Sequence, residues 1–328
     1  MSDDESYYSV NCKSDVELGN VYIPRTYNDK PVTEVNGFYN RPALESVYIP
    51  DCVTKIAGHS FGVCENLTKV RLPNGVVEYG DNVFSGSRNI TPHAVDELGN
   101  EYLGPESNPY YFLYKGDKDI TEFTVPSNVK EICNNAFLYG DLTTLTIPSN
   151  VYRINDGAFS FNYDLASVTL ASYGVDIIGM QAFACCVNLQ TITIHRTTSI
   201  HVNAFTRCYG LETINVDAAN ENYSSIDGVL YNKDQTELVI IPEGTDEEIH
   251  LPNTVTTIGN YAASLNYQNT DIHTPTIYIP TSVTRIKSFA FHNSHAHLVY
   301  AGNQSQWESI TKDDNWDYQF QGELPFNS

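Results

Sequence analysis

Apolar and polar residues alternate in short runs that recur along most of the chain. The clearest of these runs contain the apolar pairs Val47 and Ile49, Leu145 and Ile147, and Ile192 and Ile194. A period of two is typical of a β-strand with one buried face. Most of the runs end at a proline, which has no N–H to donate to a neighbouring strand, so each strand should end where the chain leaves the sheet.

A second pattern follows each proline. From Val151 through Ile154 to Phe159 the apolar residues stand three to five positions apart. This spacing predicts a short extended piece and then a helical turn that carries the phenylalanine inward.

The two patterns repeat together with a period of about 23 residues. Pro73 follows Pro50 by 23 positions, and Phe159 follows Phe137 by 22. The shared pattern is L-x-x-[IV]-x-[IVL]-P-x-x-V-x-x-I-x-x-x-A-F-x-x-C-x-x-L, in about ten copies, some of them weak. One copy buries too few apolar side chains to offset the conformational entropy of ordering its residues, so the copies must stack.

Stacked copies define the expected fold. We predict an α/β-type repeat solenoid of about ten coils of ~22–24 residues. The strands should form one parallel β-sheet, with short helical or extended turns on the other side. Residues 1–18 should form an N-terminal cap, residues 19–301 the solenoid, and residues 302–328 a C-terminal cap in which the amphipathic segment Gln304–Lys312 closes the core.

Two insertions interrupt the period, at about residues 86–119 and 217–246. Each contains two strand-like runs around Gly, Asn, Asp and Lys, which predicts a β-hairpin. In the second insertion, Val229–Tyr231 should pair with Leu238–Ile241 across the turn at 232–235. Such hairpins either contact a partner or protect the edge of the sheet.

The repeated elements IPxxVxxI and AFxxC resemble those of the BspA-like class of leucine-rich repeats. They are most intact in VYIPDCVTKIAGHSFGVCENL and TIPSNVYRINDGAFSFNYDL. SSIDGVLYNKDQTELVIIPEG and the closing LVYAGNQSQWESI are also similar to segments of bacterial members. The resemblance implies a cell-surface or secreted protein of host-associated bacteria, some of which are adhesins. It implies a non-enzymatic binding role without identifying the partner.

Charge narrows the range of partners. The chain has 18 Lys and Arg against 40 Asp and Glu, a formal net charge of −22. This charge repels nucleic acid and anionic lipid surfaces. No run reaches the ~20 apolar residues that span a bilayer. The opening MSDDESYYSV has no export signal; we expect an extracellular or cell-surface location, with the signal removed or trimmed.

Cysteine positions follow the repeat. Cys64, Cys186 and Cys208 each stand three residues after the repeat phenylalanine. Other copies have small residues at this position: Ser87, Gly140, Asn162 and Ser294. We therefore expect structural, reduced cysteines that pack as small apolar side chains. The remaining cysteines lack zinc-site spacing.

Candidate chemistry is sparse. His292, His295 and His297 lie within six residues and could hold a transition metal, but a strand edge with exposed polar residues is the alternative that we favour. The sequence contains none of the common catalytic or nucleotide-binding motifs. We predict no enzymatic activity, cofactor or metal.

The candidate site is the open face of the sheet, where the residue between two buried apolar residues points outward. In chain order these residues are Tyr22, Tyr48, Arg71, Thr124, Thr146, Thr169, Thr193, Asn215, His250 and Tyr278. Threonine is favoured on open strands for structural reasons alone. Tyr and Arg, however, are enriched at protein interfaces, so we hypothesise that Tyr22, Tyr48, Arg71 and Tyr278 contribute to binding.

Three functions fit these observations. The first is a monomeric binding protein that contacts a host matrix protein, a cell-surface protein or a glycan through the sheet face. The second is a structural spacer within a larger surface protein. An intracellular protein–protein scaffold is the weakest alternative.

Overall fold

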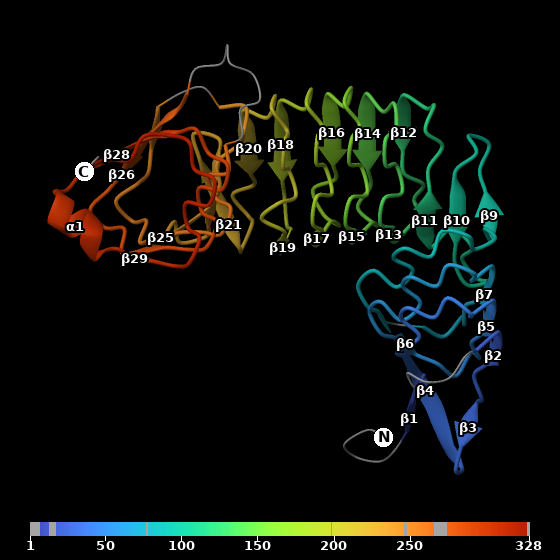
Figure 1. Ribbon diagram of the computed structural model, residues 1–328. Coiled ribbons are helices and arrows are strands. Elements are labelled where there is room, and N and C mark those ends of the chain that lie inside the picture. The colour runs from blue at the N-terminus through green and yellow to red at the C-terminus, as the bar shows by residue number, and fades with distance from the viewer. Residues whose placement is uncertain are drawn as a thin grey trace. The chain divides into compact units, whose positions relative to one another are not determined.

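The computed structural model describes residues 7–12, 18–76, 78–197, 199–245, 248–265 and 274–326 (Figure 1). Over these residues the chain makes about 13 turns of a parallel β-solenoid, which confirms the predicted fold with more turns than expected. It divides into two compact units. Unit 1 contains Met1–Asp117, Asn128–Ala136 and Ile154–Ala158, and unit 2 contains Lys118–Ser127, Phe137–Arg153 and Phe159–Ser328.

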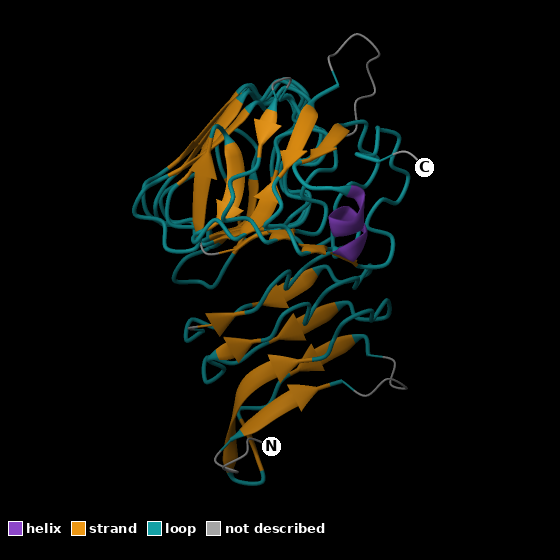
Figure 2. Cartoon of the chain, turned by 90° about the vertical axis from the view of Figure 1, so that its left-hand side faces the viewer, coloured by secondary structure: helices purple, strands orange, loops and turns teal. Residues whose placement is uncertain are grey.

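The repeat strands form a parallel ladder in each unit, which we call the first ladder (Figure 2). In unit 1 it contains β2 (Asn20–Tyr22), β5 (Ser46–Tyr48) and β7 (Lys69–Arg71). In unit 2 the first ladder is divided among three sheets. The first contains β12 (Glu122–Thr124), β14 (Thr144–Ile147) and β16 (Ser167–Leu170), the second β18 (Thr191–Ile194) and β20 (Thr213–Val216), and the third β24 (Ile249–His250), β26 (Thr276–Ile279) and β28 (His297–Tyr300).

The prediction of one parallel sheet was wrong, because the extended piece after each proline forms a second ladder. In unit 1 this ladder contains β1 (Tyr8–Asn11), β4 (Lys30–Asn36), β6 (Lys55–Ile56) and β8 (Glu78–Tyr79), and β3 (Thr26–Tyr27) forms a hairpin with β4. β1 lies within the segment that we expected to be a cap. Further strands of this kind are β13 (Glu131–Ile132), β15 (Arg153–Ile154), β17 (Ile177–Ile178), β19 (Ser199–Ile200), β25 (Thr257–Ile258), β27 (Arg285–Ile286) and β29 (Thr311–Lys312).

The helical turn predicted around each phenylalanine is also absent, and a chain of hydrogen-bonded turns takes its place. In most coils the residues two before and two after the phenylalanine adopt positive φ; Gln181 and Cys185 around Phe183 have φ of 56° and 61°. The N–H groups of Phe183 and Cys185 donate to the carbonyls of Ala204 and Thr206 in the next coil, each at 2.9 Å. We call this third set of bonds the turn ladder. It satisfies backbone groups that would otherwise be buried without partners.

The core of each unit lies inside the coils and contains a stack of repeat phenylalanines. In unit 2 the ring centroids of Phe159 and Phe183 are 5.4 Å apart, and those of Phe183 and Phe205 are 5.7 Å apart. In unit 1, Phe38, Phe61 and Phe84 stack at 5.5 and 6.0 Å. Each ring therefore packs against its equivalents in the adjacent coils.

The position three residues after the repeat phenylalanine, which holds cysteine or another small residue, also makes a hydrogen bond in several coils. Cys208 Sγ donates to the carbonyl of Phe183 in the preceding coil at 3.0 Å, and Cys186 Sγ makes the same contact with Phe159 at 3.4 Å. Ser87 Oγ and Asn162 Nδ2 donate to the equivalent carbonyls at 2.6 and 2.8 Å. Burial raises the pKa of the Cys186 thiol to about 12, so the thiol is protonated and can donate.

Each insertion contains three short strands rather than the predicted two. In the first insertion, β10 (Glu101–Leu103) pairs antiparallel with both β9 (Ala94–Val95) and β11 (Phe112–Lys115). In the second, β22 (Val229–Asn232) pairs with β23 (Glu237–Ile240), as predicted, and also with β21 (Tyr223–Ile226). β11 then pairs in parallel with β13, and β23 with β25. The last strand of each insertion therefore pairs with the next strand of the second ladder.

Helix α1 (Gln304–Ser309) is the one helix in the described part of the chain, and it lies within the predicted C-terminal cap. Asn303 caps it together with Gln306. Trp307 is buried, and Lys312 Nζ donates to the Trp307 carbonyl at 2.6 Å. Trp307 therefore covers core side chains of the last coils, among them Tyr300 at 5.5 Å.

A substitution at Cys208 tests the cysteine position. Cys208→Ser should change the free energy of unfolding by less than ~1 kcal/mol, because serine can donate to the Phe183 carbonyl. Cys208→Leu should cost about 1–3 kcal/mol through overpacking. Urea denaturation followed by circular dichroism measures both. Equal stability of the two variants would contradict a position restricted to small residues.

Candidate binding surface

The outward residues of the first ladder in unit 1 lie side by side. Tyr22 pairs in register with Tyr48, and Tyr48 with Arg71. Their neighbours Val47 and Ile49 are buried, which turns the intervening tyrosine outward. Tyr22 is 77% exposed and Tyr48 is 40% exposed. Together with Lys69 and His93, these residues form what we call the aromatic face.

Arg71 is held flat against this face. Its guanidinium carbon lies 5.0 Å from the centroid of the Tyr48 ring, and the Tyr22 ring lies 6.1 Å from Tyr48 on the other side. One terminal nitrogen of Arg71 donates to the Ile49 carbonyl at 2.6 Å, and the other donates to Asp51 Oδ2 at 2.9 Å. The cation–π contact and these two bonds orient the arginine before any partner arrives.

The arginine and its aspartate are both charged at neutral pH. The hydrogen bond from Arg71, followed by one from the backbone N–H of Asn74, lowers the pKa of Asp51. The hydrogen bond to Asp51 in turn raises the pKa of Arg71. The pair thus supplies fixed, opposite charges at the edge of the aromatic face.

The first insertion supplies one side of a shallow depression of about 380 Å³ on this face. The N–H of Thr91 donates to the Thr68 carbonyl at 2.9 Å, where the insertion leaves the ladder. His93 Nε2 lies 2.8 Å from the Val70 carbonyl, and Nδ1 lies 2.6 Å from that of Gly104. His93 therefore fastens the insertion to β7 and closes the depression beside Lys69 and Arg71.

The remaining sheet-face residues lie in unit 2, where the ladder pairs Thr124, Thr146 and Thr169 in register. Thr193 pairs with Asn215, and His250 with Tyr278. Most of these side chains are exposed, while Thr146 and Tyr278 are half-buried. None of the sequence-predicted positions carries a carboxylate, despite the acidic composition.

The His250–Tyr278 pair is a second aromatic group on this ladder. The two rings stack at 4.2 Å with an interplanar angle of 6°. The Tyr278 hydroxyl donates to Glu248 Oε1 at 3.2 Å. This group belongs to unit 2, separate in the sequence from the aromatic face of unit 1.

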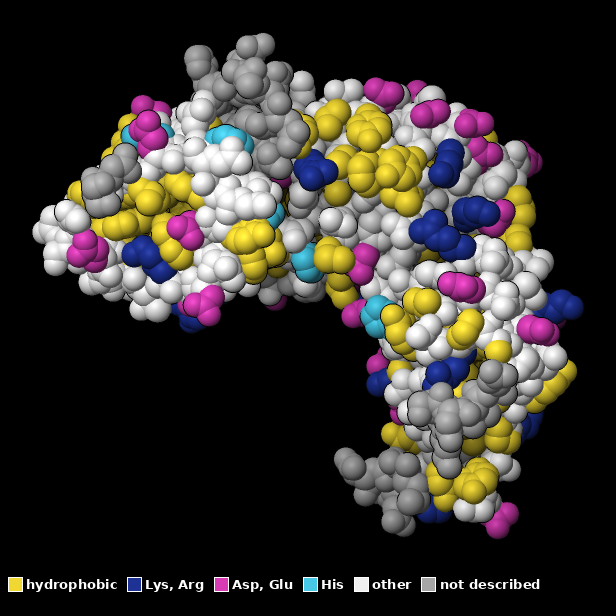
Figure 3. All heavy atoms as spheres, in the orientation of Figure 1, with side chains coloured by type: hydrophobic (Ala, Val, Ile, Leu, Met, Phe, Trp, Pro, Cys, Tyr) yellow, Lys and Arg dark blue, Asp and Glu magenta, His cyan; other side chains and the backbone are white. Residues whose placement is uncertain are grey.

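The sequence analysis missed a group of aromatic residues at the turn ladder of unit 2. Tyr139 and Phe161 each follow the repeat phenylalanine by two positions, and their rings stack at 4.5 Å. Tyr139 and Tyr163 are exposed, and Figure 3 shows apolar side chains gathered over the coils of β14 and β16. The repeated aromatic residue in AFLYG and AFSFN was the available signal.

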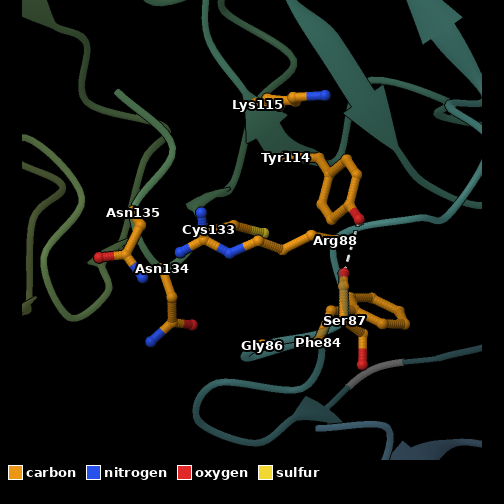
Figure 4. Close-up of a pocket in the computed structure, with 9 residues that line it drawn as sticks. All are labelled: Phe84, Gly86, Ser87, Arg88, Tyr114, Lys115, Cys133, Asn134 and Asn135. Atoms are coloured by element: carbon orange, nitrogen blue, oxygen red, sulfur yellow. Dashed lines mark hydrogen bonds between the residues drawn. The ribbon is translucent and has the colours of Figure 1, made fainter. Parts of the chain in front are cut away.

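A small cavity in unit 1 is too small for a ligand. Figure 4 shows Arg88 extending toward Cys133 and Asn135. The Tyr114 hydroxyl donates to the Ser87 carbonyl at 2.6 Å beside them. The cavity has a volume of about 50 Å³, which corresponds to one or two water molecules.

The three histidines considered as metal ligands have separate contacts. The His292 ring stacks on Tyr318 at 5.8 Å, His295 Nε2 lies 2.9 Å from Gln321 Oε1, and His297 Nδ1 lies 2.7 Å from Glu323 Oε2. Among the described residues, no group of three or more His, Cys, Asp or Glu side chains is arranged to hold a metal ion. No described helix has the length and apolar character needed to cross a bilayer.

The sequence matches one protein family over most of its length. The pattern described as "BspA type Leucine rich repeat region" matches in six copies, over residues 33–104, 108–235 and 245–312. No curated protein matches the chain.

Several solved bacterial structures are similar to this chain. The pneumococcal vaccine antigen PcpA is 18% identical, with 93% of this chain and 70% of that chain covered and a TM-score of 0.46. A leucine-rich cell surface protein from Faecalibacterium prausnitzii is 25% identical, with 90% and 91% covered and a TM-score of 0.39. A leucine-rich repeat protein from Bacteroides ovatus is 20% identical, with 97% and 66% covered and a TM-score of 0.34.

Arg71→Ala tests the charge pair on the aromatic face. The pKa of Asp51 should rise toward its ordinary value, as measured by NMR titration of the side-chain carboxyl. Because the folded-state pKa is lowered, the pair stabilises the fold above the unfolded-state pKa, and that contribution is lost as the pH falls through the folded-state pKa. The stability difference between wild type and variant should therefore shrink below about pH 4. An unchanged Asp51 pKa would contradict the contact.

Proposed function

Because the chain belongs to the BspA-type leucine-rich-repeat family, we propose that it is a non-enzymatic binding protein of the bacterial surface or its surroundings. Its partner is a host matrix protein or another cell-surface protein, and the contact is made through the aromatic face. The observation that carries this proposal is the Arg71 guanidinium held between Tyr48 and Asp51 on an exposed strand face.

The composition of the aromatic face supports the proposal. Tyrosine and arginine are enriched among the residues that dominate binding energy at interfaces. Tyr22 and Tyr48 present their rings without the entropic cost of long flexible side chains. Lys69 adds positive charge to a chain whose net charge is −22, and the Arg71 guanidinium adds N–H donors beside its paired Asp51. Both favour a partner with hydrogen-bond acceptors or acidic groups.

The rigidity of the strands also supports binding. Tyr22, Tyr48 and Arg71 lie on three paired strands whose backbone positions are set by the ladder. Little conformational entropy is therefore lost when a partner binds.

The threonine-lined coils of unit 2 favour the spacer as a second candidate function. Thr124, Thr146 and Thr169 present short, uncharged side chains in register. Such a strand face is explained by β-propensity alone. A spacer would need these coils and would not need the aromatic face.

Binding to immobilised matrix proteins, mucins and cell-surface proteins at physiological salt tests the proposal. The Tyr48→Ala/Arg71→Ala variant should bind the identified partner at least about 30-fold more weakly, because truncating even one central Tyr or Arg residue costs about 2 kcal/mol. Biolayer interferometry gives the affinities.

Thr146→Ala/Thr169→Ala is the matched control, since it removes two ladder residues of the same kind of strand in unit 2. It should bind like the wild type. If the Tyr48→Ala/Arg71→Ala variant has an unchanged melting temperature and binds with wild-type affinity, the aromatic face is not the binding surface. Absence of any partner at micromolar concentration would favour the spacer.

A further inference from the structure

The second insertion interrupts the turn ladder of unit 2. In the coil of Phe183, the N–H of Cys185 donates to a backbone carbonyl of the next coil, that of Thr206. One coil later, the equivalent N–H of Arg207 donates instead to the side-chain carboxylate of Glu243, at 2.7 Å from Oε1. The regular bonds resume at Ile241, whose N–H donates to the Ala262 carbonyl at 2.7 Å, and continue at Ala263, whose N–H donates to the Ala290 carbonyl at 2.8 Å. The Glu243 side chain of the insertion therefore accepts the hydrogen bond that a backbone carbonyl of the next coil would otherwise accept.

A pocket of about 380 Å³ opens at this interruption. Gln181, Asn203 and Arg207 line it from the coils before the insertion, and Tyr261 and His292 from the coils after it. These residues stand one or two positions from the repeat phenylalanine or its equivalent, where the turns of an uninterrupted ladder stack directly on one another. Glu243 is the contribution of the insertion.

The polar groups of this pocket are balanced in charge and in hydrogen-bonding type. One carboxylate, that of Glu243, and one guanidinium, that of Arg207, line the pocket. Glu243 is buried and Arg207 is exposed. Within the described residues, the side-chain amides of Gln181 and Asn203 make no hydrogen bond to the protein. Each amide can donate and accept at the same time. The pocket thus offers both types of bond without a net charge.

One wall of the pocket is aromatic and rigid. The Tyr261 ring stacks on Phe289 at 5.2 Å with an interplanar angle of 8°. The Tyr261 and His292 rings pack edge to face with their centroids 5.4 Å apart, and His292 in turn stacks on Tyr318. Burial lowers the pKa of His292, which keeps the ring neutral at physiological pH. Phe161 also lines the pocket.

We propose that this pocket binds a neutral saccharide unit. A sugar ring carries hydroxyl groups that both donate and accept, which the amides of Gln181 and Asn203 and the charged pair can satisfy. Its C–H face is apolar and packs against an aromatic ring such as Tyr261. Glu243 disfavours an anionic ligand, Arg207 disfavours a cation, and the amides of Gln181 and Asn203 disfavour an apolar one. This site is independent of the aromatic face, which lies in unit 1.

Saturation-transfer NMR of the full chain with a panel of methyl glycosides tests this proposal. The panel contains the glycosides of glucose, galactose, mannose, N-acetylglucosamine and N-acetylgalactosamine, and inorganic phosphate serves as the anionic probe. We expect saturable binding of at least one glycoside and none of phosphate. Gln181→Ala and Tyr261→Ala should each weaken that binding by about tenfold, as expected for loss of a hydrogen bond or an aromatic contact.

Asn135→Ala is the matched control. Asn135 stands two residues before Phe137, as Gln181 stands before Phe183, and its φ is also 56°. This variant and Tyr48→Ala/Arg71→Ala should bind the glycoside like the wild type. The proposal would be overturned by a folded wild-type chain that binds none of the glycosides, by phosphate competing for the site, or by unchanged affinity in both pocket variants.

Discussion

The structure depends on backbone hydrogen bonds between successive coils. Each repeat contributes a few residues to the first ladder, two to the second and several to the turn ladder, and in all three the partner lies in another coil. The stacked phenylalanines fill the space that these bonds enclose. A coil by itself has neither its hydrogen-bond partners nor a complete core, so register and burial arise together. The same dependence places equivalent side chains of adjacent coils side by side on the surface.

The first ladder could be predicted from sequence because its strands are long enough to show alternation. That alternation correctly placed Tyr22, Tyr48 and Arg71 on one face. Two-residue strands such as Lys55–Ile56 show no period, so the second ladder could not be predicted. The turn ladder could not be predicted either, because residues such as Val63 and Phe161 rarely adopt positive φ. Their N–H groups donate to carbonyls of the next coil, which a local sequence pattern does not show. The pocket beside Glu243 depends on where the second insertion returns, which local patterns do not show.

The two candidate sites arise from opposite features of the repeat. The aromatic face uses the regularity of the first ladder, which brings two tyrosines and an arginine into register. The pocket exists because the turn ladder is interrupted and Glu243 occupies the vacant acceptor position. In both cases an insertion adds the residue that closes the site: His93 from the first insertion and Glu243 from the second. Function in this solenoid is therefore expected beside its two insertions rather than along the uniform threonine-lined coils.

Hydrogen exchange measured residue by residue tests most directly whether the turn ladder holds the coils together. The amides of Phe159, Phe183 and Cys185 donate to the next coil, and they should exchange as slowly as those of the first-ladder strands, by opening of whole coils. Exchange at the rate of exposed loops for these amides, with slow exchange confined to the strands, would contradict the account.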